Sequence, residues 1–265
     1  MLSMLRTSAG LRRRRQQLPP PASKRLPLHV DLIPLLPRLS FLRFPVGHAY
    51  LWADQEGLTL IDTGMPGSGP LIAEAIRRLG YRTEDLRRVV LTHFHIDHAG
   101  SAAEIAEWGA VEVLAHRADA PFIRGQVEGP PPNLLDWERP LWEQVQAGLP
   151  EETVAPVRVD RELDDGDVIE LGSGVTATAV AAPGHTPGSV AVHLPAHRVL
   201  FTGDAIARVP HGEQIILGVF NVDPARATES FAKLAELDTD IACFGHGEPV
   251  VGGAGPRLRT AARPD

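Results

Sequence analysis

The chain has 265 residues, of which 43% are hydrophobic and 22% charged, a composition typical of a folded globular protein. No apolar run approaches the roughly 20 residues that a membrane-spanning helix needs, and the net charge of -7 disfavours nonspecific binding to nucleic acid. The single cysteine, Cys243, excludes an intramolecular disulfide and a thiolate-based metal site. We therefore expect neither a membrane nor a nucleic acid as partner, and any metal site must use imidazole and carboxylate groups.

The first 30 residues differ from the rest of the chain in charge. They hold seven Lys and Arg residues and no acidic residue, whereas the remaining residues hold 19 basic and 33 acidic ones. The arginines are not followed by an apolar core of about 7–15 residues, which a secretory signal requires. We predict that residues 1–30 form a disordered basic tail on a cytoplasmic protein. The alternative is an Arg-rich organellar transit peptide.

From about residue 39 onward, short β-type runs alternate with helical patterns. Between Ser68, a candidate N-cap, and Gly80, apolar residues recur on one face, which predicts an amphipathic helix with Pro70 in its first turn. In chain order we expect strands at 40–44, 49–53 and 58–62, a helix at 67–81, a strand at 87–93, a helix at 101–109 and a strand at 111–115.

Residues 116–150 break this pattern. They contain EGPPPN, two tryptophans and a helix-like stretch from Leu134 to Ala147, so we interpret them as a lid or insertion. Beyond the lid we expect strands at 156–163, 167–171, 175–181, 189–194 and 198–204, a helix at 223–238 with Asp223 as its N-cap, and a strand at 240–244. Residues 251–265 are expected to be a C-terminal tail. Antiparallel hairpins mixed with crossover helices indicate an α/β fold of two packed sheets with helices outside.

The segment LTHFHIDHAG, residues 91–100, holds three histidines and an aspartate. His93, His95, Asp97 and His98 follow a predicted buried strand directly, so we expect them on the loop at its C-terminal edge. His93 and His95 project to the same side, and the other two can turn towards a second point nearby. Imidazole together with carboxylate suits zinc, and also iron or manganese. The H-x-H-x-D-H pattern is therefore a strong indication of metal binding.

Three later loops repeat the arrangement of a strand that ends in a Gly-flanked His or Asp. They are APGHTPGS with His185, FTGDA with Asp204, and CFGHGEP with His246. Glycine lets the backbone pass close to a metal centre. We expect the four loops to meet at one edge of the two-sheet sandwich. The alternative is a histidine-rich loop that binds no metal.

These residues and their order resemble the metallo-β-lactamase superfamily. The resemblance runs from about residue 39 to 250 and includes the DTG at residues 62–64. It implies a four-layer αββα sandwich of two mixed β-sheets with flanking helices, and we assign residues 31–250 to this domain. The ligands implied by motif are His93, His95 and His185 for a first metal, Asp97, His98 and His246 for a second, and Asp204 as the carboxylate that bridges both.

The resemblance implies a dinuclear metallohydrolase with two Zn2+ ions per chain, iron or manganese being alternatives. Two cations roughly 3.5–4 Å apart share a water and lower its pKa towards about 7, so that a bridging hydroxide can attack a polarised carbonyl or phosphoryl group. Asp97 could orient that nucleophile or carry a proton, which makes it the candidate catalytic residue. Asp62 and Thr63 are candidates for hydrogen bonds to the ligand histidines, although Asp62 could instead only turn its strand into the next helix.

The chain departs from the patterns of several subfamilies, which reduces the number of candidate reactions but does not identify the substrate. N-acyl homoserine lactonases resemble the chain in length but usually carry a tyrosine where Ala207 stands. Glyoxalase II enzymes hydrolyse glutathione thioesters and add a C-terminal helical domain, whereas only 19 residues follow His246 here. The β-lactamases of the superfamily are secreted, and we see no signal peptide. RNA-processing phosphodiesterases need a nucleic-acid surface, which the acidic main domain does not obviously offer.

We therefore expect hydrolysis of a small-molecule ester, thioester, lactone or amide. Flavodiiron oxidoreductases usually have Glu where His95 stands. Mono-iron persulfide dioxygenases keep the H-x-H-x-D-H pattern but use one iron, so a dioxygenase-like oxidoreductase is the alternative function. Catalytically inactive members usually lose ligands, and here all seven expected ligands are present. The oligomeric state is left open.

Residues outside these motifs have simpler interpretations. We expect the remaining histidines to be surface or loop residues: His29, His48, His116, His193, His197 and His211. His48 and His211 could line a pocket, because nearby segments lead to the metal edge. Trp137 and Trp142 are expected to pack the lid helix rather than to contact a substrate. Cys243 is expected in the core.

Overall fold

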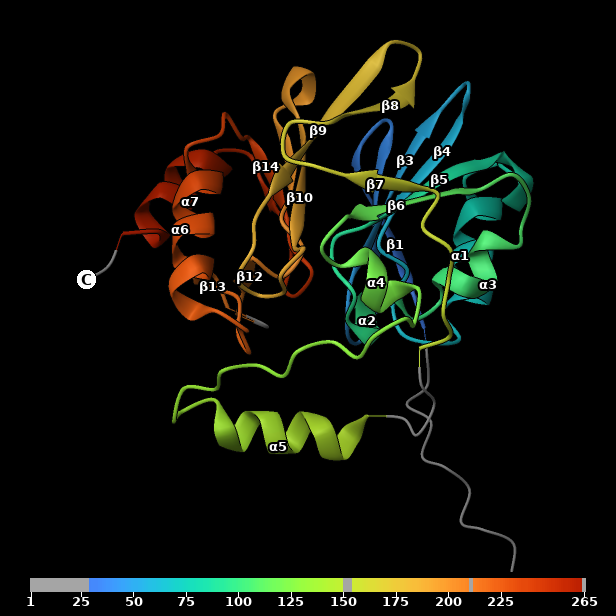
Figure 1. Ribbon diagram of the computed structural model, residues 1–265. Helices are drawn as coiled ribbons and strands as arrows, with labels where there is room; N and C mark the ends of the chain where they lie inside the picture. Colours follow the sequence, from blue (N-terminus) through green and yellow to red (C-terminus); the bar gives the residue numbers. More distant parts are fainter. Residues whose placement is uncertain (1–28, 150–153, 210–211, 264–265) are drawn as a thin grey trace, which may run out of the picture.

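Two β-sheets packed face to face form the centre of the protein (Figure 1). The structure is a computed structural model that describes residues 29–149, 154–209 and 212–263. The first sheet has the strand order β1-β2-β3-β4-β5-β6-β7. Its strands are β1 (Asp31–Leu36), β2 (Leu39–Arg43), β3 (Ala49–Asp54), β4 (Gly57–Ile61), β5 (Leu86–Leu91), β6 (Glu112–His116) and β7 (Arg161–Leu163). Pairs from β1 to β4 are antiparallel and those from β4 to β7 are parallel, so the sheet is mixed.

The second sheet has the order β15-β14-β11-β10-β9-β8 and is mixed as well. Only β11 and β14 pair in parallel; the other neighbours are antiparallel. Its strands are β8 (Val168–Gly172), β9 (Val175–Ala181), β10 (Val190–Leu194), β11 (Val199–Phe201), β14 (Ile241–Cys243) and β15 (Val250–Val251). A separate hairpin pairs β12 (Ile206–Arg208) with β13 (Ile215–Leu217).

Helices cover the outer faces of both sheets, which confirms the four-layer αββα sandwich. One apolar cluster joins the first sheet to α1 (Gly69–Arg78) and α3 (Ala102–Ala106), and another joins the second sheet to α6 (Pro224–Ala235) and α7 (Ala254–Ala261). A third cluster fills the space between the sheets. Figure 1 shows the two helical layers on opposite sides of the molecule.

Buried strands in the first sheet are apolar on both faces because both faces are covered. In β5, Val89 packs in the helical cluster and Val90 in the cluster between the sheets. Side chains alternate across a strand, so a continuous VVL run serves two cores at once. Cys243 is fully buried between the sheets, as the sequence predicts.

The two predicted N-caps, Ser68 and Asp223, are confirmed in position, although their capping contacts differ. Asp223 caps α6, and its carboxylate accepts a hydrogen bond from the Arg226 backbone N–H at 3.0 Å. Ser68 stands at the N-cap of α1, but its hydroxyl makes no capping bond. Instead, the Ser101 hydroxyl accepts a hydrogen bond from the Ser68 backbone N–H at 2.8 Å. The start of α1 is thus tied to the segment that follows the histidine motif.

The segment after Val250 corrects the expectation of a C-terminal tail. It contains α7, in which Ala254, Gly255 and Leu258 are buried against the second sheet. The sequence signal is weak because the buried positions are mostly small residues and Pro256 interrupts the run. The expected basic tail at residues 1–30 lies almost wholly outside the described residues. Within the part of the chain that the structure describes, no helix is long and apolar enough to cross a membrane.

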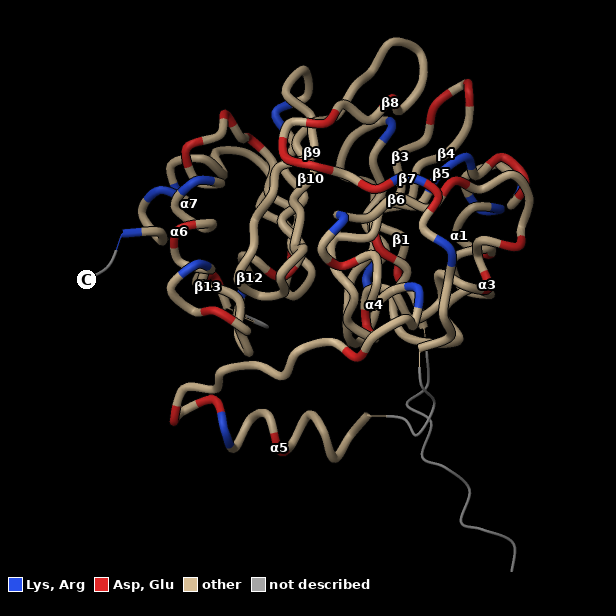
Figure 2. Tube along the Cα trace, in the orientation of Figure 1, with Lys and Arg blue, Asp and Glu red and all other residues tan. Residues whose placement is uncertain are grey.

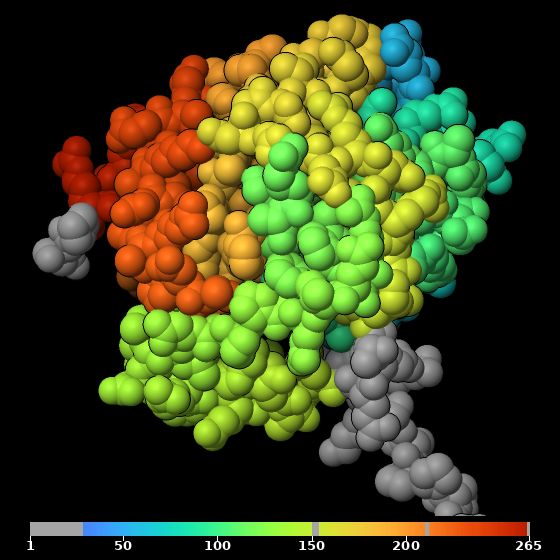
Figure 3. All heavy atoms as spheres, viewed as in Figure 1, coloured from blue at the N-terminus to red at the C-terminus, as the bar shows by residue number. Residues whose placement is uncertain are grey.

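The lid differs from the sandwich in how little of it is buried. It contains the short α4 (Ala120–Ile123) and the longer α5 (Arg139–Gly148), which starts later than the predicted Leu134 because Pro140 fits only the first turn of a helix. No residue of α5 is buried. In Figure 3 the lid atoms lie against both halves of the sandwich, and Figure 2 shows few charged residues along α5.

Candidate metal centre

Four loops bring the predicted ligands to one edge of the sandwich, where α2 and β12 lie in Figure 1. Each loop follows the carboxyl end of a strand: β5, β9, β11 and β14. Part of the H-x-H-x-D-H motif itself forms a helical turn, α2 (Ile96–Ala99), with His95 at its N-cap. This turn carries Asp97 and His98, so the motif divides between a strand end and a helix start.

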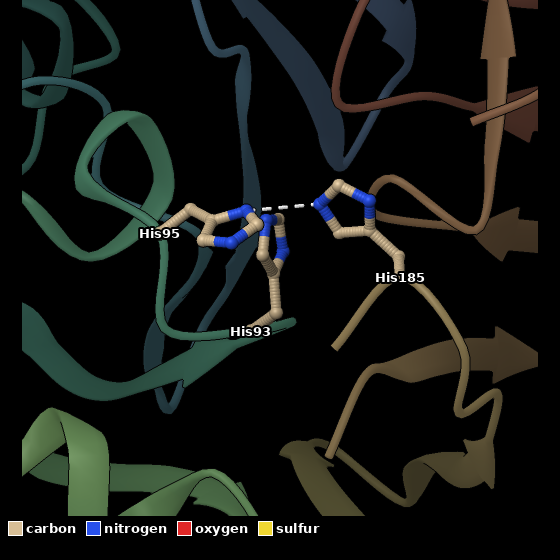
Figure 4. Close-up of side chains that lie close together, drawn as sticks. All are labelled: His93, His95 and His185. Carbon is tan, nitrogen blue, oxygen red and sulfur yellow. Dashed lines mark hydrogen bonds between the residues drawn. The ribbon is translucent and has the colours of Figure 1, made fainter. Parts of the chain in front are cut away.

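Three imidazoles form what we call the histidine group: His93, His95 and His185. Their candidate ligand nitrogens all lie within 4.8 Å of one another. His185 Nε2 lies 2.9 Å from His95 Nδ1 (Figure 4). Burial, followed by the neighbouring imidazoles, lowers the pKa of His93 and lowers that of His95 to about 3. These rings are therefore neutral at physiological pH, the form in which imidazole binds metal.

Asp97, His98 and His246 form a second cluster, which we call the mixed group. His246 Nε2 lies 3.1 Å, and His98 Nε2 3.6 Å, from Asp97 Oδ2. Burial lowers the pKa of His246, but Asp204 and Asp97 outweigh it and raise the value to about 10. The same balance raises the pKa of His98. The mixed group is thus the charged part of the site.

Asp204 lies between the two groups. One carboxylate oxygen is 3.3 Å from His98 Nε2, and the other is 3.1 Å from His246 Nε2 and 3.7 Å from His185 Nε2. Although burial raises the pKa of Asp204, the imidazoles of His246 and His98 lower it overall, so the group is ionised. Among the described residues, it is the one side chain whose carboxylate faces imidazoles of both groups.

The residues at this edge fit a pair of divalent cations. Among the described residues, His93 Nε2, His98 Nε2 and Asp204 Oδ1 are buried without a hydrogen-bond partner. Buried polar atoms without partners are costly, and imidazole with carboxylate is a donor set for zinc, iron or manganese. A Cβ atom at Gly245 would lie 2.0 Å from Asp204 Oδ1. Glycine is therefore required where this loop passes the carboxylate.

A buried carboxylate, Asp62, orients two of the imidazoles. Its Oδ2 accepts hydrogen bonds from His98 Nδ1 and from the Thr92 hydroxyl, both at 2.8 Å. The Thr92 hydroxyl in turn accepts from His93 Nδ1 at 3.0 Å. Both histidines thereby turn Nε2 towards the site. The predicted contact of Asp62 is confirmed, whereas Thr63 bonds the backbone carbonyl of His98 and not an imidazole ring.

His185 is oriented from the loop at residues 218–222, which sequence reasoning missed. His185 Nδ1 donates to the Val219 carbonyl at 3.0 Å, which leaves Nε2 directed at the site. The lid holds this loop, because the buried carboxylate of Glu138 accepts from the Phe220 backbone N–H at 2.9 Å. No local pattern in the sequence predicts the hydrogen bond between Glu138 and Phe220, which are 82 positions apart.

A model of the metallo-β-lactamase superfamily matches residues 42–246. The chain belongs to this superfamily. The match spans all four ligand loops, so the superfamily assignment and the geometry of the edge refer to the same part of the chain.

Relatives in the superfamily include the probable metallo-hydrolase YflN of Bacillus subtilis, 32% identical over 213 residues that cover 76% of this chain and 79% of that one. A hydroxyacylglutathione hydrolase of Rhodobacter capsulatus is 26% identical, and the matched region covers 75% of this chain and 61% of that one. Among solved structures, a metallo-β-lactamase of Cronobacter sakazakii with a HARLDQ motif has a TM-score of 0.62 at 26% identity, covering 82% and 80%. The chain is thus a metal-dependent hydrolase at the level of the superfamily.

Several residues outside the site differ from expectation. His193 is buried within β10 and is not a surface or loop residue, whereas His48 lies in the loop before β3, as predicted, but is buried there. The His48 backbone N–H donates to the Gly245 carbonyl at 2.9 Å, so this histidine adjoins the loop of His246. His211 lies outside the described residues. Trp142 packs edge-on against Phe220, as expected for a lid contact, whereas 61% of Trp137 is exposed.

Proposed function

We propose that the chain is a dinuclear metallohydrolase, with zinc as its metal, that cleaves a small ester, thioester, lactone or amide. The observation that carries this proposal is the position of Asp204, whose carboxylate faces His185 of the histidine group and both imidazoles of the mixed group. An ionised carboxylate between two ligand sets is suited to hold two cations side by side. A site for one metal could also use Asp204, but it would leave the imidazoles of the other group without a cation.

The chain supplies separate ligands for each cation. The histidine group would hold the first, the mixed group the second, and Asp204 both. Two cations, when bound, supply Lewis acidity and a water of lowered pKa. The protein holds the imidazoles neutral in the histidine group and turns their nitrogens inward through Thr92, Val219 and Asp62.

Asp97 is the residue we propose for orienting a water. Its side chain is 17% exposed, whereas that of His98 is fully buried, so a substrate can approach the carboxylate. Burial raises the pKa of Asp97, but the neighbouring His98 and His246 lower it overall. The ionised Oδ2 can therefore orient a water at neutral pH by accepting a hydrogen bond from its O–H group.

The lid supports a substrate with an apolar part. Leu141 and Val145 on α5 are 40% and 38% exposed, and Trp142 contacts Phe220, whose neighbour Val219 accepts from His185. Exposed apolar side chains on the helix that contacts this loop favour an acyl group. The relative named as a hydroxyacylglutathione hydrolase supports including thioesters among the candidates.

Metal analysis together with a substrate panel tests the proposal. We expect about two zinc ions per chain and turnover of at least one member of a panel of lactones, thioesters, β-lactams and phosphodiesters. One iron per chain, with oxygen consumed on glutathione persulfide, would contradict the hydrolase and favour the dioxygenase-like alternative. A protein that binds no divalent cation after reconstitution would contradict both.

A further inference from the structure

Asp119 is a buried carboxylate that lies outside the seven expected ligands. It follows β6, at the start of α4, and its side chain is fully buried. It does not cap α4, although it stands at the N-cap position. A carboxylate is expensive to bury unless hydrogen bonds compensate it. Its hydrogen-bond partners therefore indicate the role of the residue.

Within the part of the chain that the structure describes, three groups donate hydrogen bonds to Asp119, and all three belong to loops that carry the histidine group. Oδ2 accepts from the Phe94 backbone N–H at 3.1 Å and from the Thr186 hydroxyl at 2.7 Å. Oδ1 accepts from the Gly188 backbone N–H at 2.6 Å. Phe94 stands between His93 and His95, and Thr186 directly follows His185. One carboxylate thus contacts both loops of the histidine group.

The two loops come from different sheets. Phe94 follows β5 of the first sheet, and the Thr186–Gly188 turn follows β9 of the second. A Cβ atom at Gly188 would lie 2.6 Å from Asp119 Oδ1, so the turn needs glycine to come this close. Burial raises the pKa of Asp119 to about 6, and the same three donors limit that rise. At neutral pH the group is mostly ionised and accepts from both loops.

We propose that Asp119 is a positioning residue that holds the two loops of the histidine group together across the sandwich, and so sets the affinity of that group for its metal. Asp119 contacts none of the ligand side chains by hydrogen bond, in contrast to Asp62, which bonds the ring of His98 directly. Its hydrogen bonds are made beside the histidine group, at Phe94, Thr186 and Gly188, and none is made to α2, which carries Asp97 and His98. Its effect is therefore expected in the histidine group and not in the mixed group. This inference rests on the proposed metal centre.

The experiment measures cation affinity in two backgrounds that isolate the groups. His246→Ala removes an imidazole from the mixed group, and His95→Ala removes one from the histidine group. Asp119→Asn preserves size but turns one acceptor into a donor that faces N–H or O–H groups. In the His246→Ala background we expect Asp119→Asn to weaken Zn2+ binding by about 10–100-fold, the loss typical of an orienting partner. In the His95→Ala background we expect no change.

A matched control separates positioning from general loss of stability. Asp54, at the end of β3, is also buried and accepts from the Ser173 hydroxyl at 2.6 Å, the Arg38 guanidinium at 2.9 Å and the Glu56 backbone N–H at 3.0 Å. Asp54→Asn is expected to lower the free energy of unfolding without changing Zn2+ affinity in either background. The d–d spectrum of the Co2+-loaded protein gives a second readout, which we expect Asp119→Asn to change and Asp54→Asn to leave unchanged.

Thr186→Val keeps the test informative if Asp119→Asn folds poorly. It removes one of the three donors and leaves the carboxylate, so a smaller loss of Zn2+ affinity in the same background is expected. Equal loss in both backgrounds, or unchanged affinity for both variants, would overturn the inference. A wild-type protein that binds no cation would instead overturn the proposed function, so the two failures are distinguishable.

Discussion

The histidine group and the mixed group share one edge of the sandwich but are built differently. The histidine group is neutral, because burial and neighbouring imidazoles lower the pKa of its rings. The mixed group is charged and more open, since 34% of the His246 side chain is exposed. The difference teaches that two metal sites of one centre need not be equivalent. We expect the cation of the mixed group to exchange more easily.

The two groups also differ in how they are supported. His98 of the mixed group is held by a direct bond to the Asp62 carboxylate. His185 of the histidine group is held by the Val219 carbonyl, and its loop by Asp119. Support for His98 is therefore local to the first sheet, whereas support for the histidine group spans both sheets and the lid.

Asp204→Asn should abolish the distinction between the groups, and we expect it to have the largest effect. Its carboxylate faces imidazoles of both groups. Its neutralisation is therefore expected to weaken the binding of both cations by more than the ~10–100-fold that an outer hydrogen-bond partner contributes. Metal stoichiometry after dialysis, together with turnover, measures this. Retention of two cations with normal turnover would contradict a bridging role.

The pH dependence of stability should have opposite signs for the two groups in the metal-free protein. His95 has a folded pKa of about 3, below its unfolded value near 6.5, so its contribution is present above about pH 6.5 and is lost as the pH falls. His246 has a folded pKa of about 10, so its contribution is present below about pH 6.5 and is lost as the pH rises towards 10.

Urea unfolding of single variants, in the presence of a chelator, separates these contributions. We expect His95→Gln to reduce the loss of stability between about pH 6 and 4, and His246→Gln to reduce the loss between about pH 7 and 10. Identical pH profiles for the two variants would show that the groups do not differ in charge.

Asp62→Asn should sharpen the comparison by acting mainly on the mixed group. An asparagine cannot accept from both His98 Nδ1 and the Thr92 hydroxyl while keeping its amide satisfied. We expect about 10–100-fold weaker binding of the second cation and a smaller effect on the first, which Asp62 reaches only through Thr92 and His93. Competition with a chromophoric chelator measures the affinity for each cation separately. Weaker binding of the first cation alone would contradict this expectation.

Trp142→Ala should have the smallest effect and leave both metal groups intact. The Trp142–Phe220 contact has a centroid distance of 5.0 Å. Such a pair contributes about 0.5–1.5 kcal/mol, so we expect KM to rise roughly two- to tenfold while metal content stays unchanged. Trp137→Ala is the matched control, because this side chain is 61% exposed. An equal rise in KM for both variants would show that the lid acts through apolar surface in general.

The ligand loops were predictable because each follows a buried strand. Apolar runs such as the one before His93, and glycines beside His185, Asp204 and His246, are local signals, and β-strands of one direction end at one edge. The pattern of hairpins and crossovers predicted two packed sheets with helices outside, and the resemblance to the superfamily implied that both sheets are mixed. That these seven side chains act as ligands stays a prediction.

The supporting contacts were not predictable from local patterns. Asp119 lies in an ordinary HRADAP turn, and Glu138 and Val219 are distant in sequence from the groups that they hold. Only the folded chain brings them together. The helix α7 was missed for another reason, because Ala254, Gly255 and Leu258 make a weak apolar stripe. Long-range hydrogen bonds and small buried residues are where a single sequence is least informative.

The burial of Cys243 makes the chain convenient for site-specific labelling. It is the only cysteine among the 265 residues, it is fully buried between the sheets, and burial raises the pKa of its thiol. Thiol reagents react through the thiolate, so they should spare the native protein. A cysteine introduced at Gln146, exposed on α5, would then carry a spin label or fluorophore alone. The signal of that label would report motion of the lid while substrate binds, and no native residue would have to be removed from the core.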